Sequence, residues 1–283
     1  MNEAALLQAT QDLDRNRGLL WLPFLQRLTT LSPSSVVWKN ASSALEGHGD
    51  LDVVAPPTDW KGIEAEFHRW ARAESLHPVA VCRHVPGSIF LLALDPTRPA
   101  FFELDIKSRG TIRGTTIFRT RRLQPLSEMD PRGFRRLRPG AEGLLKLMMN
   151  CIGDDGELHR DRLNREHVIE LLRADPAGVR ATAALFRSER AQVLRLATGL
   201  AGGAWSPRSM RLVRARLRLR LILDPTSVVQ RARMRIRQIR IDRSAYCPGM
   251  KTLIKERRLV PGDPAGVQRI VQAHAQGAGE GSA

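Results

Sequence analysis

Apolar residues in the first 120 positions follow two different spacings. In residues 2–30 the apolar faces of one or two predicted amphipathic helices are supplied by Leu6, Leu7, Leu13, Leu19, Leu20, Leu25 and Leu28. Residues 60–75 predict another helix, because Ile63, Phe67 and Trp70 recur at helical spacing. Short apolar runs bounded by Pro, Gly and Ser instead predict strands. The expected strands span residues 36–38, 51–55, 78–84, 88–94, 100–106 and 111–118.

The pattern changes between residues 120 and 140, where Pro125, Pro131 and Pro139 interrupt any regular spacing. Beyond this stretch the strand patterns stop and helical periodicity takes over. The expected helices cover residues 141–151, 165–173, 176–187 and 188–200, and one of about four turns begins at Pro207 and ends at Asp224. We therefore expect an α+β fold. It has a mixed sheet with flanking helices over residues 1–122, an all-α, Arg-rich domain over 123–270 and a disordered tail over 271–283.

The 283 residues are enough for two ordinary domains, and 42% hydrophobic with 26% charged residues is typical of globular proteins. The net charge of +16 is unevenly distributed. Residues 1–110 hold 11 Lys and Arg against 13 Asp and Glu, so the remaining 34 basic and 16 acidic residues follow them. This asymmetry favours an acidic partner for the second half: a nucleic acid, a membrane surface or a phosphorylated substrate.

The basic residues concentrate between Trp205 and Arg240, where 11 arginines face a single acid, Asp224. Arginine at this density can neutralise several phosphates of a nucleic acid or other polyanion. The same segment is compatible with a membrane-surface helix, since Leu, Val and Met fill the gaps between the arginines. It is also compatible with Arg-rich helices that reflect only codon bias.

The three cysteines, Cys82, Cys151 and Cys247, are widely spaced and form no Cys-x-x-Cys pair. They predict neither a disulfide framework nor a zinc site, which fits a reducing cytoplasm. The first residues lack the pattern of a signal peptide, and no apolar run is long enough to span a bilayer. We expect a cytoplasmic protein without a transmembrane segment.

Two aspartates, Asp50 and Asp52, stand one residue apart in Gly-His-Gly-Asp-Leu-Asp-Val-Val at 47–54. On a strand both side chains point to one face, about 6–7 Å apart. Such carboxylates repel each other unless a cation lies between them, and Mg²⁺ prefers carboxylate oxygens together with substrate phosphates. Gly47 and Gly49 would let the backbone approach a phosphate. The same pattern is also typical of surface turns, where Asp bonds its own main chain.

A third carboxylate favours the metal-binding interpretation. Asp105 lies in the apolar run Phe-Phe-Glu-Leu-Asp-Ile at 101–106, which predicts a strand. There it would share a face with Glu103 and Lys107. If this strand and that of the first two aspartates belong to one sheet, the three carboxylates could form a cluster able to hold two metal ions.

Together these motifs resemble the nucleotidyltransferase superfamily related to DNA polymerase beta, and more narrowly a group of bacterial nucleotidyltransferases. The resemblance rests on Val-Val-Trp-Lys-Asn-Ala-Ser at 36–42, on Gly-His-Gly-Asp-Leu-Asp-Val-Val at 47–54 and on Glu-Leu-Asp-Ile at 103–106. It extends over about residues 30–200. The Gly-[Gly/Ser] element of the family is absent, and Asn-Ala-Ser at 40–42 stands in its place.

The resemblance implies a nucleotidyltransferase-like sheet followed by a helical domain. It also implies transfer of a nucleoside monophosphate from a nucleoside triphosphate such as ATP to a hydroxyl acceptor, dependent on Mg²⁺ or Mn²⁺. By this resemblance Asp50, Asp52 and Asp105 bind the metal, and Asp105 also helps to deprotonate the attacking hydroxyl. The residues expected to contact the nucleotide are Lys39, Asn40, Ser42, Gly47, Gly49, Lys107 and Arg109.

Two other functions remain open. A catalytically degenerate protein of the same fold could bind RNA or another polyanion through its Arg-rich helices. A glycosyltransferase could hold a sugar nucleotide through Mn²⁺ at its Asp-x-Asp motif. The glycosyltransferase would require a β-α-β order before the motif, whereas residues 2–30 predict helices.

Overall fold

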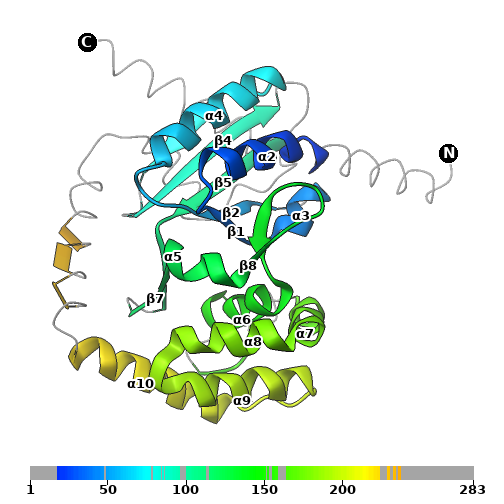
Figure 1. Cartoon of the computed structure of the whole chain (residues 1–283). Coiled ribbons are helices and arrows are strands. Elements are labelled where there is room, and N and C mark those ends of the chain that lie inside the picture. Colours follow the sequence, from blue (N-terminus) through cyan, green and yellow to red (C-terminus); the bar gives the residue numbers. More distant parts are fainter. Residues whose placement is uncertain are drawn as a thin grey trace. The chain divides into compact units, whose positions relative to one another are not determined.

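The computed structural model describes residues 18–236 except 48, 78, 84, 86, 96–99, 113–114, 151, 153–154, 159–163, 224–227, 230–231 and 234. The first part of the expected N-terminal helices and the expected tail at 271–283 lie outside these residues. The chain forms two compact units: the first combines Met1–Ser108, Asp130–Phe134 and Arg235–Ala283, and the second combines Arg109–Met129 and Arg135–Met234. Their positions relative to one another are not determined (Figure 1).

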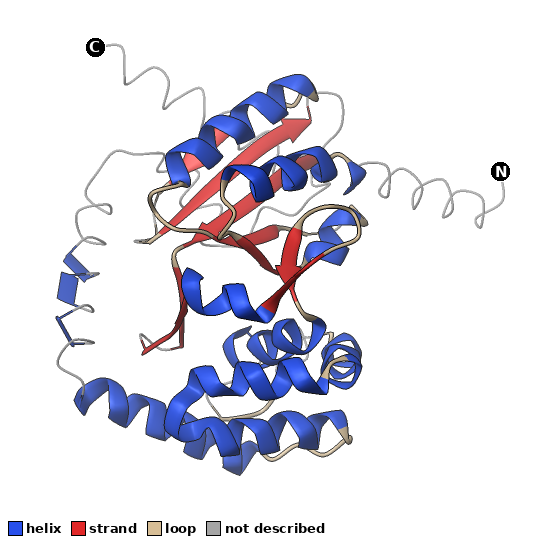
Figure 2. Ribbon diagram, in the orientation of Figure 1, coloured by secondary structure: helices blue, strands red, loops and turns tan. Residues whose placement is uncertain are grey.

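Five strands of the first unit form a mixed sheet in the order β3-β4-β5-β2-β1. Their bounds are β1 Val36–Lys39, β2 Leu51–Val54, β3 Val79–Cys82, β4 Ser88–Asp95 and β5 Ala100–Lys107. The pairs β1–β2, β3–β4 and β4–β5 are antiparallel, whereas β2 and β5 are parallel. The expected mixed α+β architecture of this part of the chain is therefore confirmed, with helices between the first strands, and with β3, β4 and β5 in succession after the last of these helices (Figure 2).

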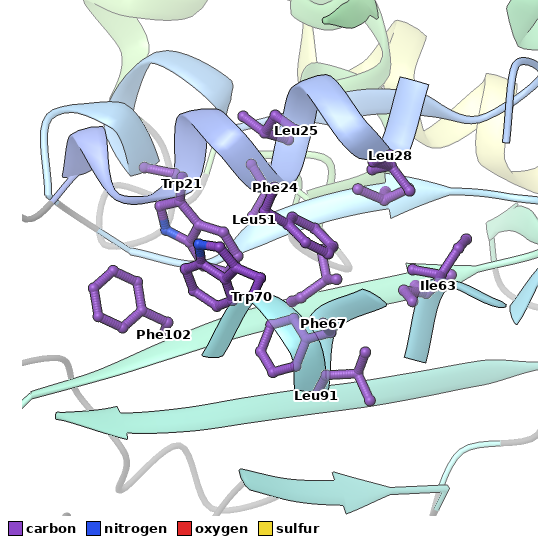
Figure 3. Close-up of a cluster of buried hydrophobic side chains, with 14 of the residues drawn as sticks. Trp21, Phe24, Leu25, Leu28, Leu51, Ile63, Phe67, Trp70, Leu91 and Phe102 are labelled. Atoms are coloured by element: carbon purple, nitrogen blue, oxygen red, sulfur yellow. The ribbon is translucent and has the colours of Figure 1, made fainter. Parts of the chain in front are cut away.

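Helices α2 (Trp21–Leu31) and α4 (Trp60–Ala73) pack against one face of this sheet. Alternation along β2 and β5 buries Leu51, Val53, Leu104 and Ile106 against the helices, so the intervening residues of these strands point to the opposite face. Figure 3 shows the aromatic side chains of the two helices pointing toward one another. Trp21 of α2 stacks on Trp70 of α4 with ring centroids 4.9 Å apart, and Phe24 and Phe67 pack edge to face at 5.6 Å.

A short helix, α3 (Ala41–Leu45), lies between β1 and β2, where the pattern of apolar positions predicts no helix. It begins after Asn40, whose φ of 64° lies in the left-handed region that asparagine tolerates. Gly47 and Gly49 follow it with φ of 89° and 78°. The chain therefore enters and leaves α3 through positions that few residues accommodate, and it reaches β2 directly afterwards.

The second unit is mainly helical, with two short antiparallel strand pairs. The pairs are β6 (Arg109–Ile112) with β7 (Thr115–Arg119), and β8 (Ser127–Met129) with β9 (Arg135–Leu137). Its helices are α5 (Thr120–Leu123), η1 (Gln124–Leu126), α6 (Pro139–Asn150), α7 (Arg165–Ala174), α8 (Pro176–Ala183), η3 (Ala184–Glu189), α9 (Arg190–Ala201) and α10 (Pro207–Leu223). The all-α character expected over residues 123–270 does not hold for β8 and β9, which lie within the stretch at 120–140 where the sequence predicts a boundary. At three residues each they are too short to give an apolar alternation.

Asp175 connects three segments of the second unit. Its carboxylate caps α8 by accepting a hydrogen bond from the backbone N–H of Gly178 at 2.8 Å, and it accepts another from Gly140 in α6 at 3.3 Å. Arg138 donates two more through Nη2 and Nε, at 2.7 and 3.1 Å. These donors hold the N-terminus of α8 beside the first turn of α6.

Helix α10 carries the first part of the Arg-rich segment and matches the four-turn helix expected there. It buries Met210, Val213 and Leu217, one apolar face at helical spacing, and α9 is its neighbour. Of the expected arginines further on, Arg231, Arg237 and Arg240 lie outside the described residues. Within the described ranges, no helix combines the length and apolar character that crossing a membrane requires.

Candidate metal centre

The parallel pairing of β2 with β5 brings two distant aspartates together. The register places Asp52 opposite Asp105 and Val54 opposite Lys107. Because Leu51 and Leu104 face the helices, Asp52 and Asp105 point to the other face of the sheet. Both side chains are buried, with 0% and 7% of their surface exposed.

Asp50 completes a three-carboxylate cluster. It directly precedes β2 and is half-buried. One carboxylate oxygen from each of Asp50, Asp52 and Asp105 lies within 4.8 Å of the others. The predicted convergence of these three residues is therefore confirmed, and their spacing would allow one metal ion to be held between them.

Two lysines enclose Asp52. Lys39 Nζ lies 2.6 Å from Asp52 Oδ2, and Lys107 Nζ lies 2.9 Å from Oδ1. Lys107 also reaches Asp105 Oδ2 at 3.3 Å, so that it bridges the two carboxylates. The sequence predicted both lysines as nucleotide contacts, whereas in the structure each is paired with the carboxylate cluster.

An irregularity in β1 directs Lys39 toward the cluster. The β1–β2 pairing shifts register between Val37 and Lys39, so Trp38 is an extra residue and Lys39 stands opposite Asp52. Regular alternation after Val37 would have placed Lys39 on the core face. The buried Trp38 ring lies beside both ammonium groups, with its centroid 5.3 Å from Lys39 Nζ and 5.6 Å from Lys107 Nζ.

The loop before β2 positions Asp50. Asn40 Nδ2 donates a hydrogen bond to Asp50 Oδ1 at 3.0 Å, so this residue, predicted to contact a nucleotide, supports a candidate metal ligand. Ser42 is exposed on α3. A Cβ added to Gly49 would meet no atom within 4 Å, so open space adjoins the backbone there.

Two other residues named from the sequence are not placed against this cluster. Arg109 begins β6 in the second unit. His48, which stands between the two glycines, lies outside the described residues.

The charges of the cluster shift its pKa values in opposite directions. Burial alone would raise the pKa of Asp52, but the two lysine ammoniums lower it below its ordinary value. Burial and the neighbouring Asp52 raise the pKa of Asp105 to about 7, although Lys107 opposes the shift. Burial and Asp52 likewise raise the pKa of Asp50, against the effect of Lys39. Asp52 contacts both lysines, whereas Asp105 contacts Lys107. Asp52 therefore loses its proton at a lower pH than Asp50 and Asp105 do.

Glu103 is a fourth carboxyl group of this face, and the sequence did not assign it to the site. It stands two residues before Asp105 on β5, so the two side chains share a face. Burial and the charge of Asp105 raise the pKa of Glu103 well above its ordinary value. The sequence could have indicated Glu103, because side chains alternate along a strand and those of residues 103, 105 and 107 share a face.

One buried oxygen of the Asp105 carboxylate lacks a hydrogen-bond donor in the described part of the chain. Asp105 Oδ1 is buried and accepts no hydrogen bond from the described residues. A buried acceptor without a partner costs about 1–3 kcal/mol. A hard divalent cation bound at this oxygen would satisfy it, and the donor set of carboxylate oxygens is the one that Mg²⁺ and Mn²⁺ prefer.

Comparisons of this chain with protein-family models, with curated proteins and with solved structures find no match.

Proposed function

We propose that this protein is a nucleotidyltransferase that depends on a divalent metal ion and transfers a nucleoside monophosphate from a nucleoside triphosphate to a hydroxyl acceptor. The observation that carries the proposal is the buried cluster of Asp50, Asp52 and Asp105, in which one oxygen of Asp105 has no partner among the described residues. Three carboxylates in this arrangement suit a cation that in turn binds substrate phosphates.

The proposed reaction needs few covalent contributions from the protein. The acceptor oxygen forms a bond to the α-phosphorus, the bond from that phosphorus to the bridging oxygen breaks, and pyrophosphate leaves. Asp50, Asp52 and Asp105 would hold the metal ion, which would stabilise negative charge on the phosphate oxygens. Asp105 would also accept the proton of the attacking hydroxyl.

The charge balance of the cluster supports one tightly bound cation. Asp50, Asp52 and Asp105 carry three negative charges when ionised, and Lys39 and the bridging Lys107 contribute two positive charges, whereas the raised pKa of Glu103 favours its neutral form. The ionised cluster therefore keeps a net negative charge, which attracts a cation. We therefore expect one strong metal site per chain.

Mn²⁺ binding followed by electron paramagnetic resonance tests the metal site without needing the acceptor. The wild type should bind one Mn²⁺ strongly, and Asp50→Asn and Asp52→Asn should each weaken binding at least tenfold. Glu64→Gln is a matched control, because Glu64 pairs with Arg83 on the surface of the same unit. Equal Mn²⁺ affinity in the wild type and both aspartate variants would refute the metal site.

Transfer of radiolabel from α-³²P nucleoside triphosphates to total RNA, protein or small metabolites, together with pyrophosphate release, tests the reaction. The proposal predicts metal-dependent label transfer by the wild type and by Glu64→Gln, and its loss in Asp52→Asn. Equal pyrophosphate release by the wild type and Asp52→Asn would contradict the proposed catalysis even if Mn²⁺ binds.

Polyanion binding is a second candidate function, favoured by the exposed side chains of Arg208, Arg211 and Arg218 on α10. It predicts RNA binding whose affinity falls steeply with salt, because neutralised phosphates release their counterions. A fluorescence-anisotropy titration at several salt concentrations measures this slope. A shallow slope, or a slope unchanged when the three arginines are replaced by glutamine, would argue against this function.

A further inference from the structure

The second unit contains a cavity that the proposed reaction does not use. It lies between α9 and α10, has a volume of about 380 Å³ and falls within the roughly 300–1,000 Å³ typical of small-ligand sites. Its polar lining consists of Gln192, Arg195, Trp205, Ser206, Ser209 and Arg216. All of them belong to one unit, so the cavity is defined without reference to the metal centre.

Two guanidinium groups give the cavity a positive charge. Arg195 comes from α9 and Arg216 from α10, and neither forms an ion pair with any acid in the described part of the chain. Both side chains are exposed, so solvent screens their charges from each other, and an anion entering the cavity would be attracted to both. Guanidinium groups bind phosphate oxygens with paired hydrogen bonds, so a phosphate is well suited to this position.

The start of α10 adds to the positive potential. Ser206 precedes the helix, and its Oγ accepts a hydrogen bond from the backbone N–H of Ser209 at 3.3 Å. The 17-residue helix has its partially positive end here. Ser206 donates its O–H to Ser209 Oγ at 2.9 Å, so the O–H of Ser209 can donate to an anion.

Trp205 supplies an apolar wall. Its indole N–H donates to the backbone carbonyl of Gly156 at 3.1 Å, so the only polar atom of the ring is already used. What Trp205 can offer a ligand is therefore contact with its ring carbons, against which a flat heterocycle packs well. Gly199, Leu196 and Leu212 also line the cavity and leave apolar space near the ring.

The side chain of Gln192 favours a ligand that carries a hydrogen-bond donor. Its Oε1 is buried and accepts no hydrogen bond from the described residues. A ligand with an N–H or O–H group directed at this oxygen would satisfy it. The cavity thus combines cations, an apolar wall and an acceptor that needs a donor.

We propose that this cavity binds a free nucleoside monophosphate. The phosphate is held by Arg195, Arg216 and the start of α10, the base packs against Trp205, and an amino, imino or hydroxyl group of the nucleoside donates to Gln192. The cavity is then a second nucleotide site, separate from the metal centre and independent of divalent ions.

Isothermal titration calorimetry of the whole protein in EDTA tests this site with AMP, GMP, CMP and UMP. At least one of the four should bind, and the matching nucleoside and inorganic phosphate should each bind at least tenfold more weakly. Arg195→Gln and Arg216→Gln should each weaken nucleotide binding about tenfold or more, because each removes charge-assisted hydrogen bonds to the phosphate. Gln192→Met keeps the length of the side chain but removes the acceptor, and should weaken the nucleotide more than inorganic phosphate.

Two control variants separate this proposal from the other proposed functions. Arg190→Gln removes an exposed charge from α9 outside the cavity, and Asp52→Asn alters the metal centre. Both should leave nucleotide affinity within about twofold of the wild type. The proposal is wrong if none of the four nucleotides binds, if Arg195→Gln and Arg216→Gln bind as well as Arg190→Gln, or if inorganic phosphate binds as tightly as the nucleotide.

Discussion

Replacing Asp105 with asparagine removes a buried charge while keeping the size and shape of the side chain. Only 7% of Asp105 is exposed, and burial together with Asp52 raises its pKa from 3.8 to about 7. Lys107, the partner of Asp105 at 3.3 Å, keeps its contact with Asp52 at 2.9 Å in the variant, so the substitution leaves no unpaired lysine. The change therefore removes one buried ionisation and also takes away the charge that, with burial, raises the pKa of Glu103.

The sign of the effect follows from the direction of the shift. In the unfolded chain Asp105 ionises near its ordinary pKa, whereas in the folded protein it keeps its proton until the pH approaches about 7. The folded state thus binds more protons between these values, and its stability falls as the pH rises from about 4 to about 7. Asparagine has no such titration, so Asp105→Asn should become more stable than the wild type as the pH rises.

The magnitude follows from about 1.4 kcal/mol for each tenfold change in proton affinity. Between pH 5 and pH 8 the wild type loses up to about 3 kcal/mol that the variant keeps, and we expect about 1–3 kcal/mol because the neighbouring carboxyls relax. A constant packing difference between aspartate and asparagine does not affect this result, because the prediction concerns how the difference changes with pH.

Urea unfolding followed by circular dichroism at several pH values, in EDTA, measures the difference, with Glu64→Gln as the surface control. Adding Mg²⁺ at pH 8 should stabilise the wild type and leave Asp105→Asn almost unchanged, because metal binding to the folded state adds to its stability. A stability difference that stays constant or shrinks as the pH rises would refute the assignment of Asp105 as a buried carboxyl of raised pKa.

Three further substitutions test the packing of each unit. Asp175→Asn should destabilise the second unit by about 1–3 kcal/mol at pH 7, since it weakens the hydrogen bonds from Arg138. These bonds and those from Gly178 and Gly140 overcome burial and lower the pKa of Asp175, so the deficit measured by urea unfolding should shrink as the pH falls below about 4. Gly178→Ala should lower the melting temperature, because its Cβ would collide with the Asp175 carboxylate. Phe67→Ala should cost about 3–5 kcal/mol in urea unfolding, because Phe67 is fully buried between α2 and α4.

Much of the first unit could be predicted from local pattern. The strands β1, β2, β4 and β5 coincide with apolar runs, and α4 follows its helical spacing closely. The aspartates of β2 and β5 were identifiable because a carboxylate between core-type neighbours must point to the other face of a strand. The convergence itself depends on the parallel pairing of β2 with β5, which the intervening helix and strands make possible.

Features set by backbone irregularity or by long-range contacts could not be predicted. Helix α3 depends on a left-handed Asn40, and asparagine before a run of small residues fits a turn equally well. Lys39 faces Asp52 only because of the extra residue in β1, which alternation conceals. The cavity beside Trp205 requires α9 and α10 to be placed together, and their arginines alone indicated only a basic surface.

The extra residue in β1 is Trp38, and its fluorescence can report on the candidate metal centre. Indole emission shifts with the electric field across the ring, and the Trp38 centroid lies 5.3 and 5.6 Å from two ammonium groups that compensate the buried aspartates. A cation entering among the carboxylates would change that field without any added dye. In a variant that keeps Trp38 as its single tryptophan, metal binding at the centre would shift the wavelength of tryptophan fluorescence.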